Sequence, residues 1–372
     1  MAEMVSGLQR LGIQFGAMFW FALLIFGLLG LGVIYVLPWW MLALVIVTGI
    51  AIGLITYVPR WLLRRSNPAF APKRTMMAHI VGGVLAALGI TALPFFYMAF
   101  WVTSGPTALP LATLTNGKKT IIFQGMQHVG SEDFYKSVVF DLEKALTEGY
   151  TLFYEGVQPV PGRPDLTQWF NETLLGSKRD LSAGYTQLAN SCGLTFQLTY
   201  FEPLLSDKAI HPARHVTADV TYGAMKDEYD RLMRESPVFA QAIAARATQK
   251  SDGDDRTLAL LSSVGKATQD QKRLVGILCR GFMGMSIAGT IGAKDTTLEP
   301  VILDFRNRAL ARFVAQSTSD KIYITYGAAH FPGFLKELQA LDPAMKVQSL
   351  RWVRPMSLPN EPQAPAGYPV TR

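Results

Sequence analysis

The polar residues with the clearest chemical potential are two histidines in matching positions of the sequence. His128 ends the sequence Gly-Met-Gln-His, His330 ends Gly-Ala-Ala-His, and each motif follows an apolar run with the composition of a β-strand. Glu155 directly follows a third such run and precedes a glycine. Because the carboxyl ends of parallel strands meet along one edge of a sheet, we expect these three side chains to converge there.

Two imidazoles and a carboxylate form a donor set that suits a divalent transition-metal ion. Such an ion lowers the pKa of a bound water toward neutrality and polarises a carbonyl oxygen. The set of His128, Glu155 and His330 therefore predicts a metal site for hydrolysis. A histidine or glutamate after one strand is commonly structural, so the prediction depends on the two matching motifs occurring together with Glu155.

The other three histidines have simpler interpretations. His79 begins an apolar run and is interpreted as an interfacial residue of a membrane span. His211 and His215 are four residues apart, but Pro212 disfavours a helix that would present both on one face. We expect loop residues here, with His215 and Asp219 as candidate auxiliary residues near the metal.

Several common catalytic and binding motifs are absent from the sequence. It contains no Gly-x-Ser-x-Gly, His-Glu-x-x-His or Gly-x-Gly-x-x-Gly, which argues against a serine hydrolase, a zincin and a dinucleotide-binding enzyme. Residues 1–76 contain six Lys or Arg and one Glu, and so account for most of the net charge of +7. The remainder is close to neutral and lacks the basic surface typical of nucleic-acid binding, so we exclude a nucleic-acid partner.

The residues around both histidine motifs resemble the TraB/GumN/Tiki superfamily. That family has a first Gly-x-x-His after a strand, a glutamate at the end of the next strand, an Arg-Asn pair at a later helix start and a final Gly-x-x-His. The matching positions here are His128, Glu155, Arg306 with Asn307, and His330. The segment around His330, YGAAHFPGFLKEL, carries the most specific part of the resemblance.

The resemblance covers roughly residues 119–345 and implies an α/β domain related to erythromycin-esterase-like and ChaN-like folds. In the Tiki branch it implies a peptidase that uses Mn²⁺ or Co²⁺, and we keep Zn²⁺ as a further candidate. Glu155 would then act as a ligand or general base, while Arg306 would stabilise a developing oxyanion or orient Glu155. A simpler alternative pairs Arg306 and Asn307 with Asp304 at the start of a helix.

Members of the TraB branch instead restrain a peptide pheromone, so two functions stay open. The first is a membrane-anchored, metal-dependent hydrolase, a peptidase in this interpretation, that acts on a peptide or protein substrate. The second is a non-catalytic module that sequesters a peptide. A role in transport has less support, because the apolar runs hold no ionisable residue except His79 at one edge.

Three long apolar runs predict transmembrane helices: 13–37, 39–58 and 77–102. Five positive residues lie between the second and third runs: Arg60, Arg64, Arg65, Lys73 and Arg74. Because positive loops stay on the cytoplasmic side, this loop and the amino terminus are predicted to be inside the cell. Everything after about residue 104 is then predicted to be extracytoplasmic.

The exported part is expected to form one α/β domain. Four short runs are predicted strands: 120–124, 150–154, 194–200 and 321–326. Helical patterns follow the first and the last, and the strand–helix–strand order predicts a mostly parallel sheet flanked by helices. The predicted boundaries are a membrane domain at 1–102, a linker at 103–118, the α/β domain at 119–353 and a disordered tail at 354–372.

The middle of the domain, residues 222–292, is helical by pattern. Its acidic segment at 251–255 is interpreted as a solvated loop, and its Gly-rich apolar part at 274–292 as a packed helix or a lid over the site. Cys192 and Cys279 lie in the exported part, where a disulfide is permitted. Two buried free thiols are the alternative.

Overall fold

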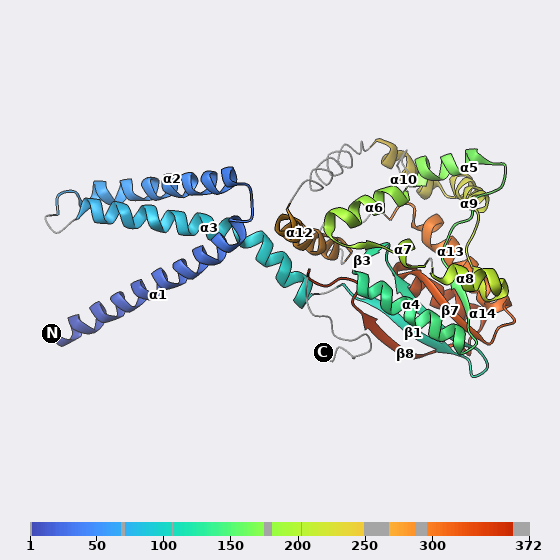
Figure 1. The fold of residues 1–372 in the computed structure, drawn as a ribbon. Helices are drawn as coiled ribbons and strands as arrows, with labels where there is room; N and C mark the ends of the chain where they lie inside the picture. The colour runs from blue at the N-terminus through green and yellow to red at the C-terminus, as the bar shows by residue number, and fades with distance from the viewer. Residues whose placement is uncertain are drawn as a thin grey trace. The chain divides into compact units, whose positions relative to one another are not determined.

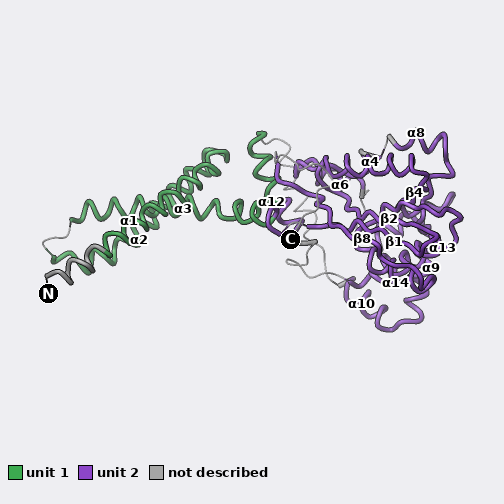
Figure 2. Tube along the Cα trace, turned by 90° about the horizontal axis from the view of Figure 1, so that it is seen from below, with its two compact units in different colours: residues 1–101, 268–278 green, residues 102–267, 279–372 purple. Residues whose placement is uncertain are grey.

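The computed structural model describes seven stretches of the chain: residues 2–67, 71–105, 107–174, 181–201, 203–248, 268–287 and 296–359. Figure 1 shows the fold, and Figure 2 distinguishes two compact units. The first unit contains residues 1–101 and 268–278, and the second contains residues 102–267 and 279–372. The long apolar helices, except the last residues of the third after Trp101, belong to the first unit and the sheet to the second (Figure 2).

Three helices make up most of the first unit: α1 (Ala2–Ile34), α2 (Trp39–Arg64) and α3 (Pro72–Ser104). Each is long and apolar enough to cross a membrane, as the sequence predicts. Gly49 and Gly53 of α2 lie against Gly83 of α3, where any added Cβ would overlap backbone atoms of the other helix. Small residues at such crossings let transmembrane helices pack with their backbones close together.

The second unit is built on a six-stranded sheet with the order β6-β4-β7-β2-β1-β8. The strands are β1 (Leu109–Thr115), β2 (Thr120–Met126), β4 (Thr151–Tyr154), β6 (His215–Thr217), β7 (Lys321–Gly327) and β8 (Lys346–Val353). β2, β7, β4 and β6 run parallel, whereas β1 is antiparallel to both β2 and β8. The prediction of a mostly parallel sheet is confirmed, with an antiparallel pair added at one edge.

The register of the parallel strands places three strand ends side by side. Gln124 of β2 and Tyr154 of β4 both lie opposite Thr325 of β7. The segments that carry the three predicted site residues therefore all leave the sheet on the side of the strands' carboxyl ends.

Helices cover both faces of this sheet. Along β7, Ile322 and Ile324 face α13 (Phe305–Gln316) and α14 (Phe331–Leu341), while Tyr323 faces α4 (Glu132–Thr147) on the other side. This alternation follows from the two-residue repeat of a strand. Because both faces are buried, β7 needs apolar residues on both, which explains why its sequence reads as a continuous apolar run.

Smaller elements surround the core. The two-residue strands β3 (Val129–Gly130) and β5 (Thr195–Phe196) form a separate antiparallel pair. The other α-helices among the described residues are α5 (Pro164–Trp169), α6 (Leu181–Cys192), α7 (Leu198–Phe201), α8 (Pro203–Ile210), α9 (Tyr222–Glu235), α10 (Pro237–Thr248) and α12 (Gln269–Ile287). Single turns of 3₁₀-helix occupy Pro212–Arg214 and Ala328–His330, and π-helical turns occupy Phe170–Leu174 and Pro300–Asp304.

Three predicted segments differ from the structure. The predicted linker at 103–118 contains β1, whose residues pair with β2 on one side and β8 on the other. The predicted strand at 194–200 holds only β5, after which the chain turns into α7. The predicted tail begins at residue 354, yet Met356 is 5% exposed. Residues 360–372 and the acidic segment at 251–255 lie outside the described residues.

Cys192 and Cys279 form a disulfide, so of the two states that the sequence left open, the bridge is present and the two free thiols are not. It joins the end of α6 to α12. Beside it, the Arg280 side chain is 5% exposed and donates to the carbonyl oxygens of Cys192 and Gly193 over 2.7 Å each. The part of 274–292 that the structure describes is therefore a packed helix.

Candidate functional site

A buried arginine is the centre of the polar cluster at the carboxyl edge of the sheet. Arg306, the second residue of α13, is 6% exposed. Its Nε donates to Oδ1 of Asp219 over 3.0 Å, and its Nη2 donates to Oδ2 of Asp219 over 2.6 Å. Nη2 also donates to Oε1 of Glu155 over 2.8 Å. Arg306 thus pairs with two carboxylates across the strand ends, instead of with Asp304 at its own helix start.

Asp219 reaches the cluster from the segment after β6. The backbone N–H groups of Gly156 and Val220 donate to its carboxylate over 2.9 and 2.8 Å. Burial alone would raise the pKa of Asp219, but the hydrogen bonds and charge of Arg306 hold the pKa below its usual value. Asp219 is therefore ionised and ties the ends of β4 and β6 to α13. It was predicted only as an auxiliary residue, but it contacts the central arginine directly.

Glu155 is the residue after β4, and its own N–H donates to the carbonyl oxygen of Thr325 over 3.0 Å. Its Oε2 accepts from the backbone N–H of Gly327, and its Oε1 accepts from Arg306. Burial would raise the pKa of Glu155, but the nearby Arg306 charge and these hydrogen bonds lower it overall. The carboxylate is therefore charged at neutral pH.

The two motif glycines have different structural roles. A Cβ on Gly327 would lie 3.2 Å from Oε2 of Glu155 and 3.4 Å from the His330 ring, so glycine leaves room for both side chains. A Cβ on Gly125 would lie 2.7 Å from the ring of Pro110 in β1. Gly327 thus leaves room for the site residues, whereas Gly125 allows β1 and β2 to pack closely.

His330 lies beside Glu155 and is 3% exposed. Its Nδ1 is 2.8 Å from Oδ1 of Asn307, an acceptor, so Nδ1 carries the proton and Nε2 is the nitrogen with the lone pair. Nε2 accepts a hydrogen bond from Nη1 of Arg306 over 3.3 Å and lies 3.8 Å from Oε1 of Glu155. Burial, with the Arg306 charge adding to it, lowers the pKa of His330 to about 4, so the imidazole is neutral at neutral pH.

The charges of this cluster sum to −1 at neutral pH. Asp219 and Glu155 are ionised, Arg306 is positive and His330 is neutral. A partly buried site with a net negative charge and an imidazole lone pair favours an additional cation.

The His128 residue is exposed, unlike His330, and its side chain is held by a different part of the chain. Its ring packs on Tyr185 of α6 with centroids 4.5 Å apart, and Gln197 Nε2 lies 2.9 Å from its Nδ1. The pKa of His128 is lowered, mainly by desolvation. The charge of Glu155 raises this pKa, and the charge of Arg306 lowers it. Sequence reasoning missed Tyr185 and Gln197, which belong to no motif.

The predicted three-residue metal site is assembled in part. His330 and Glu155 come together, and two ligands about 2.1 Å from one ion in tetrahedral geometry would lie about 3.4 Å apart, close to their separation. Across the described ranges, however, no three His, Cys, Asp or Glu side chains form a group that could hold a metal ion. The donor chemistry of His330 and Glu155 fits a divalent metal. His128 would have to move to become the third ligand.

His215 does not join the site, contrary to its prediction as an auxiliary residue. His215 is the first residue of β6 and lies opposite Leu152 of β4, whereas Asp219 lies beyond the carboxyl end of β6. Its Nε2 is 2.6 Å from Asp207, and its Nδ1 is 2.8 Å from the hydroxyl of Tyr154. These bonds attach α8 to the sheet.

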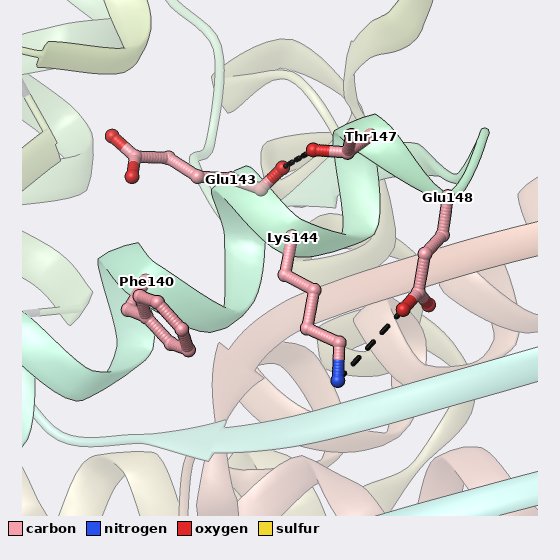
Figure 3. Close-up of a pocket in the computed structure, with 5 residues that line it drawn as sticks. All are labelled: Phe140, Glu143, Lys144, Thr147 and Glu148. Atoms are coloured by element: carbon pink, nitrogen blue, oxygen red, sulfur yellow. Dashed lines mark hydrogen bonds and ion pairs between the residues drawn. The ribbon is translucent and has the colours of Figure 1, made fainter.

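A surface hollow lies on α4, away from the cluster around Arg306 (Figure 3). It is lined by Phe140, Glu143, Lys144, Thr147 and Glu148. Thr147 donates to the carbonyl oxygen of Glu143 over 2.8 Å, and Lys144 pairs with Glu148 at 3.8 Å (Figure 3). All these interactions lie on the outer surface of one helix, so the hollow is not a candidate active site.

Comparisons with protein-family models, with curated proteins and with solved structures found no match. The resemblance to the TraB/GumN/Tiki superfamily accordingly stays a prediction based on the motif residues.

Proposed function

We propose that the chain is a membrane-anchored, metal-dependent hydrolase with its active site outside the cytoplasm and a peptide or protein as substrate. The observation that carries this proposal is the pairing of a neutral imidazole, His330, with an ionised carboxylate, Glu155, in one buried cluster of net charge −1. The choice of a peptide rests on the family resemblance alone.

His330 through Nε2 and Glu155 through its carboxylate would hold the metal, and His128 would complete the set after moving toward them. A bound Mn²⁺, Co²⁺ or Zn²⁺ would supply an acidified water and polarise the scissile carbonyl. Asn307 holds the His330 tautomer with its lone pair on Nε2, which would exchange the hydrogen bond from Arg306 for the metal. Asp219 fixes the position of Arg306. Nη1 of Arg306, which faces His330, can then stabilise negative charge that develops on the substrate.

Two observations support the extracytoplasmic location. The positive residues at the adjoining ends of α2 and α3 favour a cytoplasmic loop there, so that α3 leads outward. The disulfide between Cys192 and Cys279 is typical of exported proteins, because the cytoplasm keeps thiols reduced.

A non-catalytic peptide-binding module is the second candidate, and one observation favours it. Both oxygens of Glu155 already accept hydrogen bonds, from Arg306 and from the backbone of Gly327. A carboxylate held in this way is a weaker base than a free one, because donors to the charged form lower its pKa.

The test uses the full chain in lipid nanodiscs, freed of metal and titrated with MnCl₂ or CoCl₂ by calorimetry. We expect one bound ion, lost in His330→Ala and Glu155→Gln, and metal-dependent cleavage of a peptide library detected by mass spectrometry. His211→Ala is the matched control, because this exposed histidine belongs to the Asp207 contact and should leave both readouts unchanged. Absence of both metal binding and cleavage would reject the hydrolase. Peptide binding without cleavage would establish the second candidate.

A further inference from the structure

The outer strand of the sheet carries an exposed apolar face that the candidate site does not use. β8 is the edge strand beside β1 (Figure 1). Leu350 and Trp352 are two residues apart and so lie on the same face of β8, where they are 43% and 57% exposed. Arg351 and Arg354 are also exposed on this segment. Large apolar and basic side chains thus lie together at the carboxyl end of β8.

Arg354, the residue after β8, contacts Thr103 near the end of α3, and both residues belong to the second unit. Nη2 of Arg354 donates to the carbonyl oxygen of Thr103 over 3.3 Å. Two residues of extended strand, about 7 Å, separate Arg354 from Trp352. Trp352 also lies opposite Pro110 in the register, and Pro110 follows Ser104 by only a few residues. The exposed face therefore stays close to the point where α3 ends.

That point is where the apolar run of α3 gives way to polar sequence. Tyr97 and Phe100 on α3 are 50% and 65% exposed, as expected for side chains that face lipid. Thr103 and Ser104 are the first polar residues after them. A span that ends here places the carbonyl of Thr103 at the level of the lipid headgroups.

We propose that Leu350, Trp352 and Arg354 rest in the phospholipid headgroup layer of the bilayer that α3 leaves. Tryptophan favours this layer because its ring is apolar and its N–H is polar. Arginine lays its aliphatic stem along apolar surface and directs the guanidinium to lipid phosphates. The contact would hold one edge of the sheet at the membrane. It is independent of the proposed hydrolase, because none of these residues belongs to the cluster around Arg306.

The experiment measures how close β8 comes to lipid in the full chain. Both native cysteines form the disulfide, so one introduced cysteine is the only thiol available for an NBD fluorophore under non-reducing conditions. The test variants are Trp352→Cys and, with Trp352 retained, Leu350→Cys. Phe140→Cys is the control, because Phe140 is 66% exposed on α4 and outside the proposed contact. Each labelled protein is reconstituted in phosphatidylcholine nanodiscs, with or without phosphatidylglycerol, that contain a headgroup nitroxide quencher.

Labels at positions 350 and 352 are expected to lose most of their emission to the nitroxide, while the label at position 140 retains its emission. Preferential quenching in either lipid mixture supports the proposal. Quenching at 350 and 352 no stronger than at 140 overturns it. Protection of these labels from nitroxide together with disulfide crosslinking between two copies of Trp352→Cys also overturns it, and identifies a second copy of the chain as the occupant.

Discussion

Arg306 and Asp219 form a buried ion pair with two hydrogen bonds, in which Nε and Nη2 donate to the two carboxylate oxygens over 3.0 and 2.6 Å. The pair joins the start of α13 to the segment after β6, so it holds the site and the sheet together. Replacing Asp219 by asparagine weakens these charge-assisted hydrogen bonds, while Glu155 stays as the counter-charge of Arg306. Losing a hydrogen bond to a charged group costs about 1.5–3 kcal/mol of folding free energy. We expect Asp219→Asn to destabilise the chain by this amount in urea unfolding of the full protein in detergent.

The matched control for this variant is Asp165→Asn. Asp165 pairs with Arg163 at 2.7 Å, but its side chain is 61% exposed. Exposed pairs contribute about 0–1 kcal/mol, so the control should unfold nearly as the parent does. Equal losses in the two variants would show that the Arg306 pair has no special structural role.

The pH dependence of stability should report the burial of His330. The folded pKa of His330 is about 4, whereas an unfolded histidine has a pKa near 6.5. As the pH falls, His330 takes up its proton in the unfolded state before it does so in the folded state. The free energy of unfolding therefore decreases between pH 7 and pH 4. Below pH 4 the contribution of His330 no longer changes. The expected loss between pH 7 and pH 5 is about 2 kcal/mol, measured by urea unfolding with a chelator present.

The pH variants are His330→Gln and His211→Gln. The first should lose most of this pH dependence, because the group that titrates in the unfolded state is gone. The second removes an exposed histidine and should retain the dependence. A wild-type unfolding free energy that is equal at pH 7 and pH 5 would contradict the buried, neutral state of His330.

The central strands were predictable from the sequence because both of their faces are buried. β2 and β7 are continuous apolar runs for this reason. The parallel pairing of β7 with β4 then brings Glu155 and His330 to the same end of the sheet. β1 was interpreted as linker because its Pro and Thr residues are typical of loops, although Pro110 packs on Gly125. β8 was not predicted at all, since its side chains are almost all exposed and mixed in character.

The contacts of the site were less predictable than its location. The partner of Arg306 could not be deduced, because Asp219 is 87 residues away and no short motif relates the two. Asp219 and His215 looked equivalent in the sequence, but they fall at opposite ends of β6. Strand topology thus explains which polar residues meet, and only the folded chain shows which of them pair.

The disulfide between Cys192 and Cys279 predicts a specific thiol chemistry. The unfolded, unreduced protein should have no thiol that reacts with an alkylating reagent, and the reduced protein should have two, as counted by mass spectrometry. Replacing both cysteines with serine should lower the free energy of unfolding by about 2–4 kcal/mol, because the bridge closes a long loop. Two alkylated thiols before reduction would contradict the bridge and weaken the extracytoplasmic assignment.

Asn307 can orient His330 only because residue 333 is a glycine. A Cβ on Gly333 would overlap the side-chain amide of Asn307. We expect Gly333→Ala to push Asn307 away from Nδ1 of His330, to destabilise the chain by about 1–3 kcal/mol and to weaken metal binding about 10–100-fold in calorimetry. Gly184→Ala is the control, because Gly184 lies in α6 with nothing within 4 Å of an added Cβ. Helix propensity predicts that this control stabilises the chain by up to about 1 kcal/mol, so similar effects of the two alanines would refute the role of Gly333.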